Sequence, residues 1–157
     1  MSRIGVISDT HDHLNNVRKA VALFNRLKPD WVVHCGDVVA PFVLKEMSGL
    51  RMPVYAVYGN CDGDRAALRQ RAAEFGFALH DGPHGFDMGG KRVVVSHQPP
   101  NPLPDCDFYL HGHTHKLRHE GKRPVIVNPG EACGWLSARA TVAMLDTETA
   151  DVEFFDL

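Results

Sequence analysis

The sequence predicts an α/β fold in which a largely parallel sheet is followed by a second sheet of mixed or antiparallel strands. Two observations lead to this prediction. Short runs rich in Val and Ile alternate with helical patterns through residue 76, and short strands without a long helical pattern fill the rest of the chain. The repeated strand–helix order favours parallel strands joined by helices, and we expect the second sheet to pack on the first.

The first half is expected to contain three strands and three helices. Apolar residues at 14, 17, 21, 24 and 27 have helical spacing, and Pro29 ends that helix. Pro41 suits the first turn of a second helix, while Asp64 and Gly76 suit the N-cap and the end of a third. The expected elements are strand Arg3–Ser8, helix Asn15–Leu27, strand Trp31–Cys35, helix Pro41–Met47, strand Pro53–Tyr58 and helix Asp64–Phe75.

Gly and Pro turns divide the second half into short strands. The expected strands are Phe77–Leu79, Gly85–Met88, Arg92–Ser96, Phe108–His111, Pro124–Asn128, Ala140–Asp146 and Asp151–Phe155. We expect Pro99–Pro104 to be an active-site loop. The basic residues from Lys116 to Arg123 are interpreted as a solvated hairpin, with phosphate contact as the less favoured alternative.

Length and composition are those of one globular domain, and we expect residues 1–157 to form it. The chain is 44% apolar and 23% charged with a formal net charge of −2, which argues against disorder and against a strongly electrostatic nucleic-acid binder. No apolar run approaches the roughly 20 residues of a membrane span. Asp9 interrupts the apolar segment at the start of the chain, where a signal peptide would need an unbroken apolar core. For this reason we expect no membrane partner. Four cysteines without a CxxC pair favour a cytoplasmic location.

Residues that can bind metals follow the predicted strands, at the point where each strand ends. They are Asp9, His11, Asp37, Asn60, His97, His113 and His115. Because ligands bind at the carboxyl ends of strands in open α/β sheets, we expect these side chains to lie together.

The chemistry of this set favours two divalent ions. Carboxylate, amide and imidazole ligands without a thiolate argue against a structural zinc site, and seven ligands are too many for one tetrahedral ion. Asp37 is the natural bridge, because a carboxylate can share its two oxygens. The glycines that precede Asp37, Asn60 and His113 are expected to provide the backbone angles that turn each ligand into the site; they are Gly36, Gly59 and Gly112.

Each candidate taken alone has an ordinary explanation as a turn, a cap, an interior histidine or a solvated loop. Several segments that deliver such residues to one sheet edge favour the metal site over those explanations. The other histidines are expected at the surface (His13, His80, His84 and His119) or packed and hydrogen-bonded inside strands (His34 and His111).

These motifs, in this order, resemble those of the calcineurin-like metallophosphoesterases. The five are Asp9-x-His11, Gly36-Asp37, Gly59-Asn60-Cys61-Asp62, Ser96-His97 and Gly112-His113-Thr114-His115. Asn128-Pro129-Gly130 and the short length resemble the family's small prokaryotic branch of phosphodiesterases. The resemblance implies a four-layer α/β/β/α sandwich of two mixed sheets. It also implies that one ion is held by Asp9, His11, Asp37 and His115, and the other by Asp37, Asn60, His97 and His113.

The resemblance further implies a phosphodiesterase in which two divalent ions activate water for attack on a small phosphodiester. Manganese is the favoured metal, with nickel, iron, zinc and magnesium left open. Asp37 and Asn60 would act through the metals, and Asp62 would orient a ligand. Cys61 stands where many relatives have a histidine that protonates the leaving group, and this departure favours substrates with good leaving groups. A substrate contact and a buried packing residue are both open for Cys61.

Two other functions remain open. One is a metal-binding scaffold without catalysis, because a relative of this fold serves as a coat subunit with degraded catalytic motifs; the intact ligand set argues against it. The other is a nuclease, because some larger relatives cut DNA; the slightly acidic balance argues against it. The sequence determines neither the native substrate nor the oligomeric state.

Overall fold

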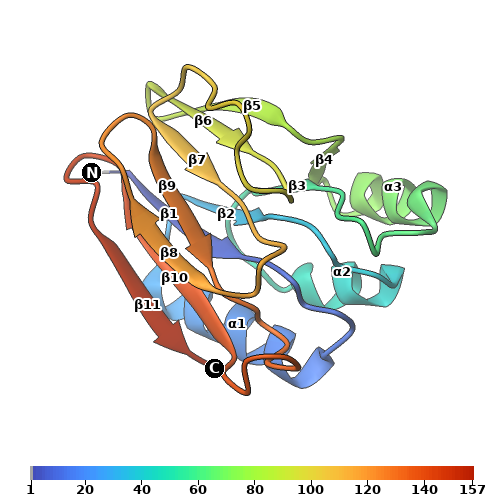
Figure 1. The fold of residues 1–157 in the computed structure, drawn as a ribbon. Coiled ribbons are helices and arrows are strands. Elements are labelled where there is room, and N and C mark those ends of the chain that lie inside the picture. The colour runs from blue at the N-terminus through green and yellow to red at the C-terminus, as the bar shows by residue number, and fades with distance from the viewer. Residues whose placement is uncertain (1) are drawn as a thin grey trace.

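Two β-sheets pack face to face in this computed structural model, which describes residues 2–157 (Figure 1). The elements are β1 (Arg3–Ile7), α1 (Leu14–Leu27), β2 (Trp31–His34), α2 (Pro41–Met47), β3 (Val54–Val57), α3 (Arg65–Glu74), β4 (Ala78–His80), β5 (His84–Met88), β6 (Lys91–Val95), β7 (Phe108–Leu110), β8 (Leu117–Glu120), β9 (Val125–Pro129), β10 (Thr141–Asp146) and β11 (Val152–Asp156). The six-stranded sheet has the order β11-β10-β1-β2-β3-β4, and the five-stranded sheet has the order β5-β6-β7-β9-β8.

Strands β1 to β4 run parallel, as the alternation of strands and helices predicts. Strands β10 and β11 extend this sheet in antiparallel fashion beyond β1. In the second sheet β6, β7 and β9 are parallel, and β5 and β8 pair antiparallel at its two edges. The predicted pair of mixed sheets is therefore confirmed.

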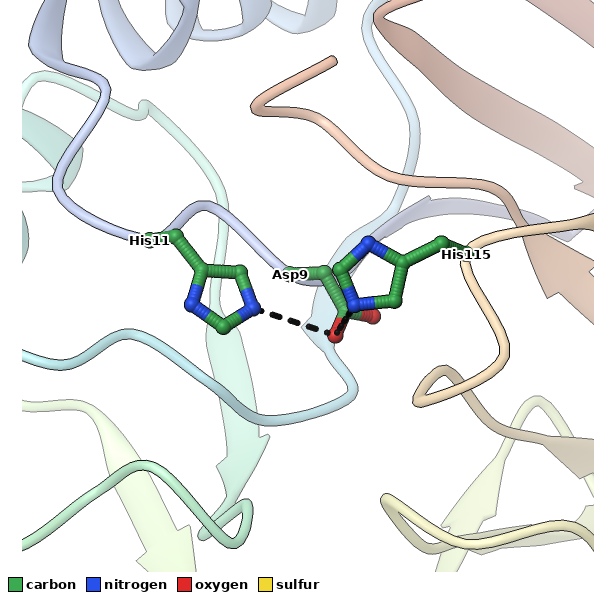
Figure 2. A group of neighbouring side chains, drawn as sticks. All are labelled: Asp9, His11 and His115. Atoms are coloured by element: carbon green, nitrogen blue, oxygen red, sulfur yellow. Dashed lines mark ion pairs between the residues drawn. The ribbon is translucent and has the colours of Figure 1, made fainter. Parts of the chain in front are cut away.

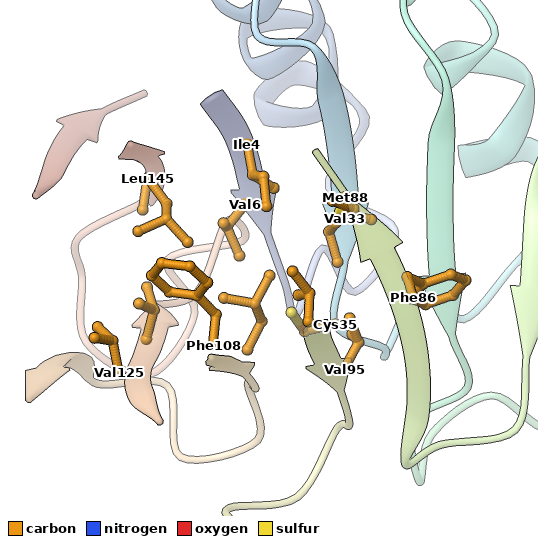
Figure 3. Packing of buried hydrophobic residues seen from close by; sticks show 14 of the residues in the cluster. Ile4, Val6, Val33, Cys35, Phe86, Met88, Val95, Phe108, Val125 and Leu145 are labelled. Carbon is orange, nitrogen blue, oxygen red and sulfur yellow. The ribbon is translucent and has the colours of Figure 1, made fainter. Parts of the chain in front are cut away.

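The largest hydrophobic core lies between the sheets, where Val6 and Val33 from the first sheet face Val95 and Phe108 from the second (Figure 3). The other face of the first sheet packs on the helices, with Phe24 of α1 among the fully buried side chains. Strands β1 and β2 are therefore buried on both faces, which explains their nearly unbroken apolar sequence.

The helical layers differ from the α/β/β/α order that the resemblance implies. All three helices found within residues 2–157 pack on the six-stranded sheet, and none follows α3. The outer face of the five-stranded sheet carries a small apolar cluster of Val94, Tyr109 and Ile126, which Cys106 covers from the loop before β7. On this face a loop therefore takes the place of the helical layer.

Every predicted element is present, and its ends lie within one residue of the prediction. Asp64 caps α3 as expected, because its Oδ1 accepts a hydrogen bond from the Ala67 amide at 3.0 Å. The segment expected as a solvated hairpin contains one further strand, β8, which pairs with β9. Strand β8 is an exposed edge strand, so its side chains lack the apolar alternation that predicts strands. Among the described residues, no helix combines the length and apolar character that a membrane span requires.

Candidate metal centre

The loops that follow β1, β2, β3, β6 and β7 meet at one edge of the sandwich and bring the predicted ligands together. His11 Nε2 lies 3.5 Å from Asp9 Oδ1 and 3.3 Å from Asp37 Oδ2. His115 Nε2 lies 3.2 Å from Asp9 Oδ1, and Figure 2 shows the two imidazoles directed at that carboxylate from two separate loops. His97 Nε2 lies 3.2 Å from Asp37 Oδ2. The Asp37 carboxylate therefore faces both His11 and His97.

The last two candidates lie beside His97. His113 Nδ1 is 3.3 Å from His97 Nε2 and 3.1 Å from Asn60 Oδ1. All seven predicted side chains thus form one continuous cluster, with Asp37 between the part that contains Asp9 and the part that contains Asn60.

The cluster concentrates negative charge in a buried place, since Asp9 and Asp37 are almost fully buried. Burial favours the protonated form of Asp37, but the contacts with His11 and His97 outweigh it and hold the pKa of this carboxyl well below its usual range. In return, Asp37 and then Asp9 raise the pKa of His11 to about 10. This field attracts a cation, which can be a proton on an imidazole or a metal ion.

The residues present fit a divalent metal site. Asp9 Oδ1 and His11 Nε2 are buried and have no hydrogen-bond partner among the described residues. Such atoms are costly unless something satisfies them, and a metal ion would accept both as ligands. The mixture of carboxylate oxygens and imidazole nitrogens suits manganese, iron, nickel or zinc.

Backbone conformation aims these side chains into the cluster. Five of the predicted ligands have positive φ angles, namely Asp9 (52°), His11 (38°), Asp37 (60°), His113 (67°) and His115 (60°). This left-handed region costs residues other than glycine about 1 kcal/mol or more. Hydrogen bonds hold the strained turns: the amide of Asp9 donates to Gly36 O at 3.0 Å, and that of His11 donates to Asp37 O at 3.1 Å.

Of the three glycines expected to supply unusual backbone angles, only Gly36 does so, with φ +98°. The expectation is wrong for Gly59 and Gly112, which instead provide space. A Cβ on Gly59 would lie 2.1 Å from Asp37 Oδ1, and one on Gly112 would lie 2.5 Å from Asp9 Oδ2. Ligand side chains from other loops pack directly against these two α-carbons.

Asp62, predicted to orient a ligand, contacts main chain. Its Oδ2 accepts hydrogen bonds from the amides of Asp37 (3.1 Å) and Gly59 (2.7 Å), and its Oδ1 accepts one from Val39 (2.7 Å). The buried Asp62 carboxylate therefore ties together the loops that follow β2 and β3.

Glu131 is a site residue that sequence reasoning missed. It is 1% exposed, and it accepts hydrogen bonds from His115 Nδ1 and, at 2.7 Å, from Ser137 Oγ. Burial raises the pKa of Glu131, but His115 and Ser137 outweigh burial and lower this pKa to about 2. The available signal was only an acidic residue directly after Asn128-Pro129-Gly130.

Cys61 is exposed at the margin of the cluster, so the alternative of a buried packing residue is wrong. Its amide donates to Asp37 Oδ1 at 2.8 Å. Partial burial of the sulfur and then the charge of Asp37 raise the pKa of the Cys61 thiol, which is therefore protonated at neutral pH.

The remaining histidines largely follow prediction. His34 and His111 are buried and hydrogen-bonded, to Thr10 Oγ1 at 3.1 Å and to Arg118 Nη1 at 3.2 Å. His119 is exposed, as predicted. The other three expected at the surface are partly buried: His13 caps α1, and His80 stacks on His84.

A two-sheet α/β sandwich with such a carboxylate–imidazole cluster at the strand ends defines a class of protein, the metal-dependent phosphoester hydrolases. A model of the calcineurin-like phosphoesterase superfamily domain matches residues 2–150, and the chain belongs to this superfamily.

Relatives agree with this assignment. A protein named Phosphodiesterase MJ0936, from Methanocaldococcus jannaschii, is 35% identical over 93% of each chain. A solved structure described as a novel archaeal phosphodiesterase is 34% identical, covers 99% of each chain and has a TM-score of 0.90. The structure of Yfce, a phosphoesterase from E. coli, is 20% identical, covers 98% of each chain with a TM-score of 0.74, and shares the fold.

Proposed function

We propose that this chain, as a single domain, hydrolyses small phosphodiesters with the help of two divalent metal ions. The observation that carries the proposal is the position of the Asp37 carboxylate, 3.3 Å from His11 Nε2 and 3.2 Å from His97 Nε2, between two groups of metal-type ligands. The archaeal relative named as a phosphodiesterase supports the choice of diesters.

The proposed ligands of one ion are Asp9, His11, Asp37 and His115, and those of the other are Asp37, Asn60, His97 and His113. When bound, two such ions supply charge neutralisation for the phosphate and a nucleophile at neutral pH. Manganese is the favoured metal, and nickel, iron, zinc and magnesium are the alternatives. The four free cysteines support a cytoplasmic location, where thiols stay reduced.

The protein's own groups prepare the ligands. The Cys61 amide fixes Asp37 Oδ1, which leaves Oδ2 to face His11 and His97. His97 Nδ1 lies 2.8 Å from Cys35 O, so this nitrogen carries the proton and Nε2 is free to bind a metal. Glu131 accepts a hydrogen bond from His115 Nδ1 in the same way, so His115 Nε2 is also free to bind a metal.

Cys61 and Asp62 complete the proposed catalytic set. A thiol with a raised pKa is a weak proton donor, so Cys61 favours diesters whose alcohol leaves without strong acid assistance. Asp62 maintains the relative position of the two loops that carry Asp37 and Asn60.

The test is hydrolysis of bis(p-nitrophenyl) phosphate with added Mn²⁺, with a chelator, and by Asp37→Ala. We expect the chelator and Asp37→Ala to abolish nearly all turnover. Asp151→Ala, which removes an exposed carboxylate beside β11, is the matched control and should retain wild-type activity. Turnover that is indifferent to the chelator would contradict the proposal.

Two results would favour the other functions. Full metal loading without turnover of any phosphoester would favour a scaffold. Binding to single-stranded DNA that weakens steeply with salt would favour a nuclease.

A further inference from the structure

A groove leads away from the proposed metal centre, between the loops that follow β3 and β6. Its near part is a cavity of about 220 Å³ whose walls include Tyr58, Asn60, Arg65, Ser96, His97 and Gln98. Its far part is a cavity of about 300 Å³ that shares Gly82, Ser96 and Gln98 with the near part, so the two lie next to each other. Because Asn60 and His97 are proposed metal ligands, the near part opens on the metal centre.

Arg65 gives the near part a positive charge. Among the described residues that line either cavity, it is the only arginine, lysine, aspartate or glutamate. Its guanidinium carbon lies 4.7 Å above the Tyr58 ring, and Nε donates to Asp62 O at 3.3 Å. The stack and this hydrogen bond hold the planar group in place before any ligand arrives.

The present partner of Arg65 is exchangeable. Arg65 Nη1 lies 3.1 Å from Asp81 Oδ1, and the Asp81 side chain is 75% exposed. An ion pair so exposed contributes little free energy, so an anion in the groove can take the place of Asp81.

The far part of the groove suits a different kind of group. Its walls are uncharged and include four prolines, Tyr109, Gln98 and Asn101. A neutral, partly apolar body fits these walls, with amide and hydroxyl groups available for a few hydrogen bonds.

We propose that this groove binds one of the two alcohol groups of the substrate, and that Arg65 selects an alcohol that carries a second anionic group, a carboxylate or a phosphate. The inference rests on the proposed phosphodiesterase function. Two divalent ions would neutralise the single charge of a scissile diester, which leaves the Arg65 charge for another anion. The guanidinium fork matches a carboxylate or a phosphate, so Arg65 is a specificity-determining residue.

The test compares matched esters with the same leaving group. The first is p-nitrophenyl 3-carboxypropyl phosphate, and the second is its 3-carbamoylpropyl analogue, which has nearly the same shape without the second charge. A third ester ending in a phosphonate distinguishes a phosphate from a carboxylate as the preferred anion. The measured quantity is the ratio of kcat/KM between each charged ester and the carbamoyl ester, after subtraction of the enzyme-free rate.

We expect the Mn²⁺-loaded wild type to prefer a charged ester by about tenfold, as for one charge-assisted hydrogen bond. Arg65→Gln should reduce the ratio to about one, whatever its absolute rates. Asp81→Asn should raise the ratio, since it removes the competing carboxylate, and a merely structural role for Arg65 would not predict that rise. Arg71→Gln is the matched control on the same helix, because Arg71 pairs with Glu74 and lines neither cavity.

A wild-type ratio near one would overturn the inference. An unchanged ratio in Arg65→Gln, including an equal loss for both esters, would also overturn it, because Arg65 would then act on the scissile phosphate or on the loop. Should the wild type fail to hydrolyse bis(p-nitrophenyl) phosphate, the proposed function fails separately. The ratio of dissociation constants for the same esters, measured by calorimetry, then tests the groove without turnover.

Discussion

Replacing Gly59 by alanine should disable the proposed metal centre while the fold survives. The added Cβ would lie 2.1 Å from Asp37 Oδ1 and 2.4 Å from the Asp37 amide nitrogen. Ordinary contact begins near 3.4 Å, so the carboxylate must retreat by about 1.3 Å. That movement breaks its 2.8 Å hydrogen bond from the Cys61 amide and displaces Oδ2 from His11 and His97.

A misplacement of about 1 Å costs on the order of 100-fold in rate, and overpacking costs about 1–3 kcal/mol of stability. We therefore expect kcat/KM for bis(p-nitrophenyl) phosphate to fall about 100-fold or more in Gly59→Ala, with weaker Mn²⁺ binding by calorimetry. Circular dichroism should still report a folded protein. Gly63→Ala is the matched control in the same loop, because a Cβ there meets nothing within 4 Å. Wild-type turnover and metal binding in Gly59→Ala would refute the close packing of Asp37 on Gly59.

Three further changes test other parts of the structure. Gly5→Ala places a Cβ 2.7 Å from the buried Phe24 ring and should lower the free energy of unfolding in urea by about 1–3 kcal/mol, whereas Gly85→Ala, with open space, should not. Glu131→Gln should weaken Mn²⁺ binding by about 10–100-fold, because His115 loses its carboxylate partner. Since the pKa of Glu131 falls from 4.5 to about 2 on folding, its stabilising effect is complete above pH 4.5 and is lost as the pH falls toward 2, so acid titration of Glu131→Gln should lack that part of the stability loss. Cys61→Ala should reduce turnover of bis(p-nitrophenyl) phosphate only a few-fold, and a loss as large as that in Asp37→Ala would contradict the minor role given to the thiol.

Much of the architecture could be predicted because it follows local patterns. Apolar periodicity located the strand ends, and the alternation of strands and helices implied that β1, β2 and β3 end at the same edge. Asp9, Asp37 and Asn60 lie just beyond those ends, so their convergence could be expected before any contact was known.

Residues whose role depends on contacts between distant segments were not predictable in this way. Glu131 lies 16 residues from His115, in a loop without periodicity. The sequence pattern places Arg65 only at the start of a predicted helix and gives no sign of a role in the site. In the structure Arg65 lines the groove beside His97. The loop that replaces a fourth helical layer also depends on packing, here of Cys106 on the outer face of the second sheet.

The sequence by itself determined the two sheets, the element boundaries and the identity of the side chains at the strand ends, because neighbouring residues set backbone propensity and apolar period. Only the tertiary structure decided that Gly59 and Gly112 leave room for carboxylates, that Glu131 supports His115, and that a groove lined by Arg65 lies beside the cluster. Each of these features depends on contacts between residues on separate loops, and these contacts form only when the two sheets pack together.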